Sequence, residues 1–354
     1  MNALVEQGSR VRVLDSLVEQ VHGGTAPARL NSAAELIRAD VCDATSVAKA
    51  LDGIDVVYHE AAEVGVGQSM YEIARYVKAN DLGTAVLLEE MIKRAGQFKK
   101  LLVASSMSIY GEGAYVCDVC GDITPNIRAT DQLLKREWEL KCSVCASILK
   151  PVPTPEIKPL IPTSVYAVSK QVQEQYCLVV GKAYNIPTVA LRYFNVYGSG
   201  QALSNPYTGV CAIFSARLLN GNPPMIFEDG LQSRDLVHVS DIVQANLLAL
   251  ENDSANYETF NIGSGTSITV KEVAHLLARG LGKDIDAEVT GKYREGDIRH
   301  CIADISKSRR LLGYEPKVRL ADGIPELLSW VSEQTAKDAV GEATATLANY
   351  NLVR

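Results

Sequence analysis

The 354-residue sequence contains no apolar run of the roughly 18 residues that a membrane-spanning helix requires, which excludes a transmembrane helix. The opening MNALVEQGSRVRV lacks the apolar centre of a signal peptide, so we expect a cytoplasmic protein. Lysine and arginine number 35 against 42 aspartate and glutamate, and no basic block occurs. This mildly acidic balance argues against partners such as nucleic acid or an anionic membrane surface. Internal repeats are also absent.

Segments typical of strands alternate with segments typical of helices from the start of the chain. Strands are predicted at 10–15, 35–40, 55–62, 99–106 and 187–198, and helices at 2–7, 69–94 and 163–184. This alternation predicts an α/β fold, a Rossmann-like doubly wound parallel sheet. We assign residues 1–198 to this domain. Shorter mixed elements at 199–335 predict a smaller C-terminal substrate lobe with returns to the first domain, followed by a tail at 336–354.

An insertion interrupts the alternation between Ser106 and Thr163, where more than fifty residues connect a strand to a helix. Such a length is unusual for an α/β connection. We expect residues 113–162 to form a small Cys-rich module of their own. The module ends in PVPTPEIKPLIP at 151–162, which holds five of the thirteen prolines and predicts a stiff, extended tether.

Two C-x-x-C pairs lie in this insertion, and they account for half of the eight cysteines. The four residues are Cys117, Cys120, Cys142 and Cys145. Their spacing is typical of a zinc-ribbon-like structural zinc site with four thiolate ligands, which leaves no open position for catalysis. Four unrelated buried thiols are the alternative. The other cysteines are scattered and are expected in the core: Cys42, Cys177, Cys211 and Cys301.

Tyr166 and Lys170 stand four residues apart on a predicted helix, so both side chains project from one face. A phenol acts as a base near neutral pH only if positive charge stabilises its anion, which Lys170 supplies. Ser106 ends a predicted parallel strand, where open α/β sheets build their sites, and its hydroxyl is placed to bind the same substrate oxygen. The alternative is a surface tyrosine beside a solvated lysine, because Y-x-x-x-K occurs often by chance.

With these residues in view, the chain resembles the extended short-chain dehydrogenase/reductase family, specifically its nucleotide-sugar epimerases. The resemblance runs from residue 1 to about 335, interrupted by the Cys-rich insertion. The blocks that carry it are VLDSL (13–17), ADVCD (39–43), VVYHEAAEVGVGQSM (56–70), SSMSIYG (105–111), YAVSK (166–170), RYFNVYG (192–198), RDLVHVSD (234–241) and REGD (294–297). The insertion makes the pattern most similar to dTDP-L-rhamnose 4-epimerases.

The resemblance implies NAD as cofactor and a nucleotide sugar as substrate. The implied NAD-binding residues are Asp15 at the adenosine ribose, Asp40 and Val41 at the adenine, His59, Ala61 and Ala62 after the next strand, Asn80 near the nicotinamide, and Tyr166 and Lys170. For His59 we favour packing in the core over proton transfer. Asn195, Arg234 and Arg294 are implied to bind the substrate diphosphate, which suits forked guanidinium groups. For Arg234, an exposed ion pair with Asp235 is the alternative.

The implied reaction is 4-epimerisation. Tyr166 removes the proton of the sugar C4 hydroxyl, NAD accepts the hydride, Ser106 orients the sugar, and the hydride returns on the other face of the 4-keto sugar. The expected pair is dTDP-L-rhamnose and dTDP-6-deoxy-L-talose; UDP-glucose or UDP-glucuronate is the alternative. Met107 and Ser108 follow the serine where a 4,6-dehydratase would carry Asp-Glu, which speaks against dehydration. We expect a homodimer.

The phosphate-binding glycines of the family are not found ahead of Asp15. This aspartate takes the position of the acidic residue that follows the glycines by about 20 residues at the end of the second strand. We therefore expect the first strand and the glycine loop to be missing, and NAD binding to be weak. A catalytically incompetent nucleotide-sugar-binding relative is thus a second hypothesis. A zinc-ribbon adaptor on an α/β scaffold is the third.

Overall fold

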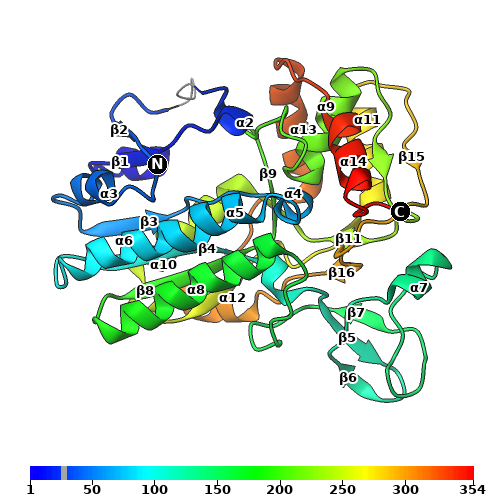
Figure 1. Cartoon of the computed structure of the whole chain (residues 1–354), viewed down its shortest axis with the longest axis horizontal. Coiled ribbons are helices and arrows are strands. Elements are labelled where there is room, and N and C mark those ends of the chain that lie inside the picture. Colours follow the sequence, from blue (N-terminus) through cyan, green and yellow to red (C-terminus); the bar gives the residue numbers. More distant parts are fainter. Residues whose placement is uncertain (25–29) are drawn as a thin grey trace.

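The computed structural model describes residues 1–24 and 30–354. Its main sheet is parallel and has the strand order β13-β8-β4-β3 (Figure 1). The four strands are β3 (Val56–His59), β4 (Lys100–Ser106), β8 (Thr188–Tyr193) and β13 (Thr259–Ile262). Every residue of β4 is buried, as expected for a central parallel strand that is covered on both faces.

Helices cover both faces of this sheet. One face packs against α3 (Ala44–Ala50), α6 (Gly83–Ile92) and α8 (Val165–Ala183), and the other against α10 (Val239–Glu251) and α12 (Ser306–Leu312). Along β4, Leu101 and Val103 belong to the first core and Leu102 to the second, because successive strand side chains point to opposite faces. The predicted Rossmann-like, doubly wound α/β fold is confirmed.

The N-terminal strands form a sheet of their own. β1 (Arg12–Asp15) pairs in parallel with β2 (Glu35–Arg38), while α1 (Asn2–Glu6) and α2 (Glu19–His22) flank β1 in sequence. The second edge of β1 and the second edge of β3 have no ladder partner within residues 1–24 and 30–354. The parallel sheet is therefore divided at this point.

Two predicted elements are divided in the structure. The helix expected at 69–94 consists of α4 (Val66–Ser69), α5 (Ile73–Tyr76), the π-helical η1 (Val77–Leu82) and α6. The strand expected at 187–198 breaks after β8, and its remainder, β9 (Asn195–Tyr197), pairs with β12 (Leu236–His238). At this break the backbone N–H of Phe194 still donates to Ile262, whereas that of Asn195 donates to Asp235. The chain thus passes from the main sheet toward the lobe.

The smaller lobe has a second core, built on α9 (Val210–Leu219), α11 (Val270–Gly280) and α13 (Leu320–Ser332). Short strands complete it: β10 (Met225–Ile226) with β15 (Glu288–Val289), and β14 (Ile268–Thr269), β11 (Ser233–Arg234) and β16 (His300–Cys301) in that order. The last helix is α14 (Val340–Asn349), and 3-10 turns occur at η2 (Met107–Tyr110) and η3 (Asp253–Ala255). No helix of the described chain has the length and apolar character to cross a bilayer.

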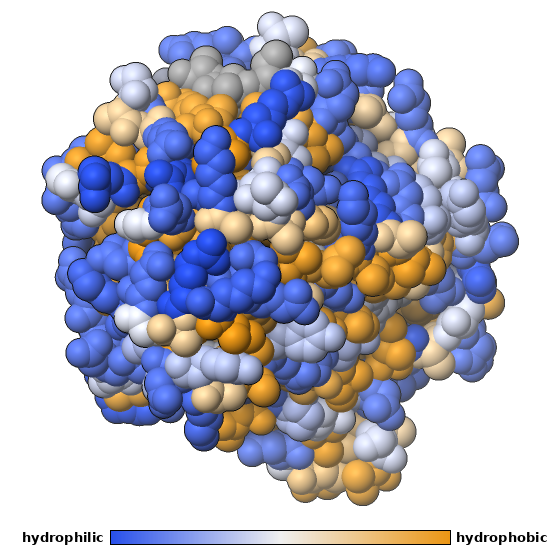
Figure 2. Space-filling view, turned by 60° about the vertical axis from the view of Figure 1, so that its left-hand side comes forward, coloured by the Kyte–Doolittle hydropathy of each residue, from blue (hydrophilic) through white to orange (hydrophobic). Residues whose placement is uncertain are grey.

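The insertion forms a three-stranded antiparallel sheet with the order β6-β5-β7. Its elements are β5 (Ala114–Cys117), β6 (Gly121–Ile123), α7 (Thr130–Leu134) and β7 (Lys150–Val152). The module projects from the lower part of the molecule in Figure 1. Figure 2, which brings the N-terminal side forward, shows hydrophilic and hydrophobic side chains interspersed over that face.

The proline-rich segment after this module is packed into the protein, so its interpretation as a tether is wrong. Thr154 is fully buried, and its backbone N–H donates to the carbonyl of Ile302 at 2.7 Å. The buried Lys158 ammonium donates to the carbonyls of Tyr110 and Pro159 at 3.0 and 3.2 Å. The bond to Ile302 holds the extended backbone against the lobe, and the bond to Tyr110 holds it against the turn after β4.

Candidate active site

A cavity of about 540 Å³ lies at the carboxyl ends of β4 and β8. Ser105 and Ser106 enter it from the end of β4, and Tyr193, Phe194 and Asn195 from the end of β8. The rest of the lining comes from the segment after β3, from α4, η2 and the first turns of α8, and from the smaller lobe and α14. Open α/β sheets bind their ligands at this edge.

Tyr166, Ser106 and Lys170 all line this cavity, so the structure brings the three predicted catalytic residues together. The start of α8 is set by Ser164, whose hydroxyl accepts a hydrogen bond from the backbone N–H of Ala167 at 3.1 Å. Tyr166 and Lys170 then follow on successive turns. The Ser106 hydroxyl accepts hydrogen bonds from the backbone N–H and the hydroxyl of Ser108, at 3.1 and 2.9 Å.

Burial controls the protonation of both residues on α8. It lowers the pKa of Lys170 to about 8, and the Lys170 ammonium donates to Gln173 Oε1 at 2.8 Å. Burial also raises the pKa of Tyr166, and the Ser106 side chain offsets part of this rise. The expected lowering of the Tyr166 pKa is therefore not found for the chain by itself, because the effect of burial outweighs that of Ser106.

Gln173 and Glu60 are functional candidates that sequence reasoning missed. The Gln173 amide donates to Thr84 Oγ1 at 2.9 Å and to the carbonyl of Ala61 at 3.3 Å, which joins Lys170 to the segment after β3. Its position three residues after Lys170 on one helix face was the available signal. Glu60 lines the cavity and accepts a hydrogen bond from the Tyr193 hydroxyl at 3.1 Å.

His59 and Asn80 lie in the core, and neither lines the cavity, so their assignment as NAD contacts stays a prediction. His59 is 3% exposed, its Nε2 lies 2.7 Å from Thr84 Oγ1, and burial lowers its pKa to about 3. The favoured packing role fits this neutral, buried ring. Asn80 donates to Ser169 Oγ at 2.8 Å and accepts from the Glu63 N–H at 2.7 Å. It ties the segment after β3 to α8.

The residues predicted at the adenosine end of NAD lie near the ends of the separate N-terminal strands. Asp15 ends β1 and accepts a hydrogen bond from the Leu17 N–H at 2.7 Å. Asp40 follows β2. Partial burial acts to raise its pKa, but hydrogen bonds from the Cys42 N–H and from Lys78 lower it overall, so its carboxylate stays ionised. Val41 packs against Gly83.

Of the two alanines after β3, Ala62 lines the cavity, whereas Ala61 contributes the carbonyl that accepts from Gln173.

All three residues predicted to bind the diphosphate line the cavity: Asn195, Arg234 and Arg294. The Arg234 guanidinium donates to three backbone carbonyls between 2.8 and 2.9 Å, and it still faces the cavity. The alternative ion pair with Asp235 is absent from the described residues, because this carboxylate accepts from Ser264, Gly265 and Ala303. Arg294 lies over the Phe227 ring, 4.9 Å from its centroid.

Three buried oxygens in the cavity lining have no hydrogen-bond partner within the described residues. They are Asn195 Oδ1, Gln201 Oε1 and Gln232 Oε1. Buried acceptors are normally satisfied, so these three residues are candidates for polar contacts with a ligand in the cavity.

The four cysteines of the insertion converge. Their sulfur atoms all lie within 4.8 Å of one another, and Cys117 and Cys145 are 3.4 Å apart. Tetrahedral zinc with Zn–S bonds of about 2.3 Å needs sulfurs separated by slightly less than 4 Å. The arrangement therefore has the geometry to hold one metal ion.

A model of the NAD dependent epimerase/dehydratase family matches residues 1–127 and 145–263. The dTDP-L-rhamnose 4-epimerase of Burkholderia thailandensis is 33% identical over 334 residues, which cover 94% of this chain and 90% of that protein. The unmatched residues 128–144 lie in the Cys-rich insertion.

Solved structures of nucleotide-sugar epimerases are also similar to this chain. The UDP-glucose 4-epimerase of Thermotoga maritima with UDP-glucose has a TM-score of 0.76 at 32% identity, and the alignment covers 94% of each chain. The UDP-glucuronic acid 4-epimerase of Bacillus cereus, in complex with UDP-glucuronic acid and NAD, has a TM-score of 0.75 at 28% identity with the same coverage. With its parallel sheet and its Ser-Tyr-Lys cavity, the chain belongs to the NAD dependent epimerase/dehydratase family.

Proposed function

We propose that the chain is an NAD-dependent nucleotide-sugar 4-epimerase that interconverts dTDP-L-rhamnose and dTDP-6-deoxy-L-talose. The main support for a reaction at the sugar C4 atom is that Tyr166, Ser106 and Lys170 line one cavity. The similarity to the Burkholderia enzyme favours the dTDP-linked 6-deoxy sugar. UDP-glucose and UDP-glucuronate are the alternative substrates, because the similar solved structures bear those names.

The residues in the cavity fit the nicotinamide end of NAD, and Asp15 and Asp40 fit its adenosine end. When bound, NAD supplies the acceptor and the later donor of the hydride. Tyr166 Oη takes the proton of the C4 hydroxyl as the carbonyl forms and returns it as the carbonyl is reduced. Ser106 donates a hydrogen bond to the same substrate oxygen. With NAD bound, the Lys170 ammonium, one turn away, is expected to favour the phenolate form of Tyr166.

Incubation with three nucleotide sugars in the presence of NAD tests this proposal. We expect dTDP-L-rhamnose to give its C4 epimer, detected by NMR from the coupling constants of the H4 proton. Epimerisation of UDP-glucose or UDP-glucuronate in its place would move the assignment to the alternative substrate. No change in any of the three would contradict the proposed reaction.

We also propose a structural zinc ion bound by Cys117, Cys120, Cys142 and Cys145, since all four sulfurs gather within one coordination sphere. We expect about one zinc ion per chain in reduced protein, and its loss when Cys117 and Cys142 are both replaced by serine. Elemental analysis of the purified protein measures this. Cys42→Ser is the matched control, because Cys42 lies outside the cluster and should leave the zinc content unchanged. A reduced parent protein without zinc would contradict the site.

We further propose that the sheet becomes continuous when one more parallel strand, followed by a glycine-rich turn, lies between β1 and β3. The edges of these two strands that have no ladder partner within the described residues support this. A chain carrying such a unit ahead of Met1 is expected to bind NAD more tightly and to melt at a higher temperature, because strand edges are paired and backbone N–H groups face the pyrophosphate. Equal NAD affinity and equal thermal midpoint would contradict this.

The divided sheet is also the observation that favours the second candidate, a nucleotide-sugar-binding relative without turnover. The comparison of extended and unextended chains separates the two, because only the first candidate predicts epimerisation by the extended chain.

A further inference from the structure

We propose that residues 340–354, here called the C-terminal strap, form part of the substrate site and contact the nucleoside diphosphate half of the substrate. This inference rests on the proposed nucleotide-sugar substrate. The strap comprises α14 and the five residues after it (Figure 1).

One face of α14 forms a wall of the main cavity. Val340, Ala343, Thr344 and Leu347 all line it. Their spacing of three and four residues places them on a single helical face. Ala345, by contrast, is exposed on the outer side. The helix is therefore built into the site with a defined orientation.

Both ends of the strap are fastened to the lobe. Just before α14, the Asp338 carboxylate accepts from the Asn222 amide at 2.7 Å and lies 3.4 Å from the Arg217 guanidinium. At the far end, Tyr293 and Arg354 exchange two backbone hydrogen bonds of 2.9 and 3.0 Å, and Val353 pairs with Arg294 in an antiparallel bridge. The backbone of Arg294 is thus held by the last residues of the chain.

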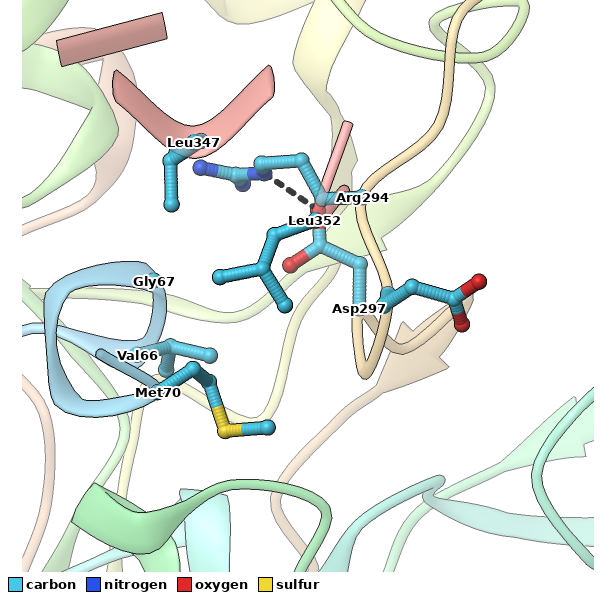
Figure 3. A pocket seen from close by; sticks show the side chains of 8 residues that line it. Val66, Gly67, Met70, Arg294, Asp297, Leu347 and Leu352 are labelled. Carbon is cyan, nitrogen blue, oxygen red and sulfur yellow. Dashed lines mark hydrogen bonds and ion pairs between the residues drawn. The ribbon is translucent and has the colours of Figure 1, made fainter. Parts of the chain in front are cut away.

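The strap also reaches the first domain. Leu347 packs against Gly67, and the rings of Tyr350 and Tyr71 stack with centroids 4.8 Å apart. Figure 3 shows Leu347 and Leu352 facing Val66 and Met70 across a small hollow that Arg294 borders. The strap therefore crosses the cavity from the lobe to α4.

The groups nearest the strap suit a nucleoside diphosphate. Thr344 contacts Met225 at 3.9 Å, Oγ1 to Sδ, and Met225 lines the cavity together with Phe227 and Gln232. Phe227 offers an aromatic face that Arg294 covers, and Gln232 offers an unpaired buried acceptor. An aromatic face, an amide acceptor and a guanidinium are the groups that recognise a base and its diphosphate. Nucleotide affinity should therefore depend on the position of α14 and on the side chains of its inner face.

Two phenylalanine substitutions on the same helix test this. Ala343→Phe on the inner face is expected to weaken binding of UDP and dTDP on the order of tenfold, because the larger side chain occupies part of the cavity. Ala345→Phe on the outer face is the matched control and should bind as the parent does. Isothermal titration calorimetry with each nucleoside diphosphate alone measures affinity, and the thermal midpoint reports folding.

Leu347→Ala is a second inner-face variant, which tests the same contact if Ala343→Phe lowers the thermal midpoint. This variant removes contacts at the cavity wall without adding bulk, and it should also bind more weakly than the parent. Parent-like affinity in both inner-face variants would overturn the role of the strap and leave the proposed function standing. A parent chain that binds neither UDP nor dTDP would overturn the proposed substrate class, and this inference with it.

Discussion

Replacing Tyr166 with phenylalanine is expected to lower kcat for epimerisation by about 10²–10⁴-fold, the usual contribution of a general acid–base group. Only the hydroxyl that exchanges the proton is lost. The ring keeps its edge-on contact with Tyr76, with centroids 6.5 Å apart at 81°. Folding and nucleotide-sugar affinity should therefore stay close to those of the parent. Steady-state rates and calorimetric affinities, measured with NAD present, give the two quantities separately.

Tyr207→Phe is the control for this substitution. Tyr207 also lines the cavity, but its hydroxyl is paired with that of Tyr71. Loss of this hydroxyl should change kcat far less than loss of the Tyr166 hydroxyl. A Tyr166→Phe variant with nearly parental kcat would remove the tyrosine from its assigned role.

Replacing Arg299 with methionine is expected to destabilise the protein by about 3 kcal/mol, the lower end of the range for a broken buried ion pair, because it removes the buried guanidinium that neutralises one buried carboxylate, Glu228, and two partly exposed ones, Glu139 and Asp229. Arg299 is fully buried. Its guanidinium donates to Glu139 of the insertion at 3.0 Å, to Glu228 of the lobe at 2.9 Å and to Asp229 at 2.7 and 2.9 Å. The substitution therefore removes one ionic contact between the insertion and the lobe, while the buried Arg128–Glu228 pair at 2.8 Å remains. Urea unfolding measures the change in the free energy of unfolding.

Arg319→Met provides the comparison. Arg319 is 82% exposed and pairs with Asp322 one turn away on the surface, so its loss should cost less than about 1 kcal/mol. Similar losses of unfolding free energy in the two variants would show that the Arg299 network adds nothing beyond a surface ion pair.

The convergence of the three proposed catalytic residues in one cavity could be predicted from the sequence because local pattern determines it. Helical spacing places Tyr166 and Lys170 on one face, and a continuous apolar run places Ser106 at the end of a buried strand. The carboxyl ends of neighbouring parallel strands then meet at one edge of the sheet. The class of the sheet and the position of the cavity both follow from such short-range signals.

Other features depend on contacts between distant segments and could not be predicted. The apolar pattern of residues 187–198 continues through Phe194, yet the backbone changes its hydrogen-bond partner there. The N–H of Asn195 donates to the carbonyl of Asp235, next to β12, and not to the main sheet. The strap has a weak pattern of Ala, Thr and Val, and only its packing against the lobe and α4 places it in the site. The prolines of 151–162 suggested a tether because sequence does not reveal the buried partners of Thr154 and Lys158.

A nucleotide sugar carrying deuterium at C4 tests the central proposal most directly, because the hydride is expected to leave and return to the same carbon. The sugar is incubated with the chain and NAD in ordinary water, and the product is analysed by NMR and mass spectrometry. We predict a C4 epimer that retains its deuterium at C4. A C4 epimer whose deuterium has exchanged with solvent, or the absence of any C4 epimer, would contradict transient oxidation at C4 in the Tyr166 cavity.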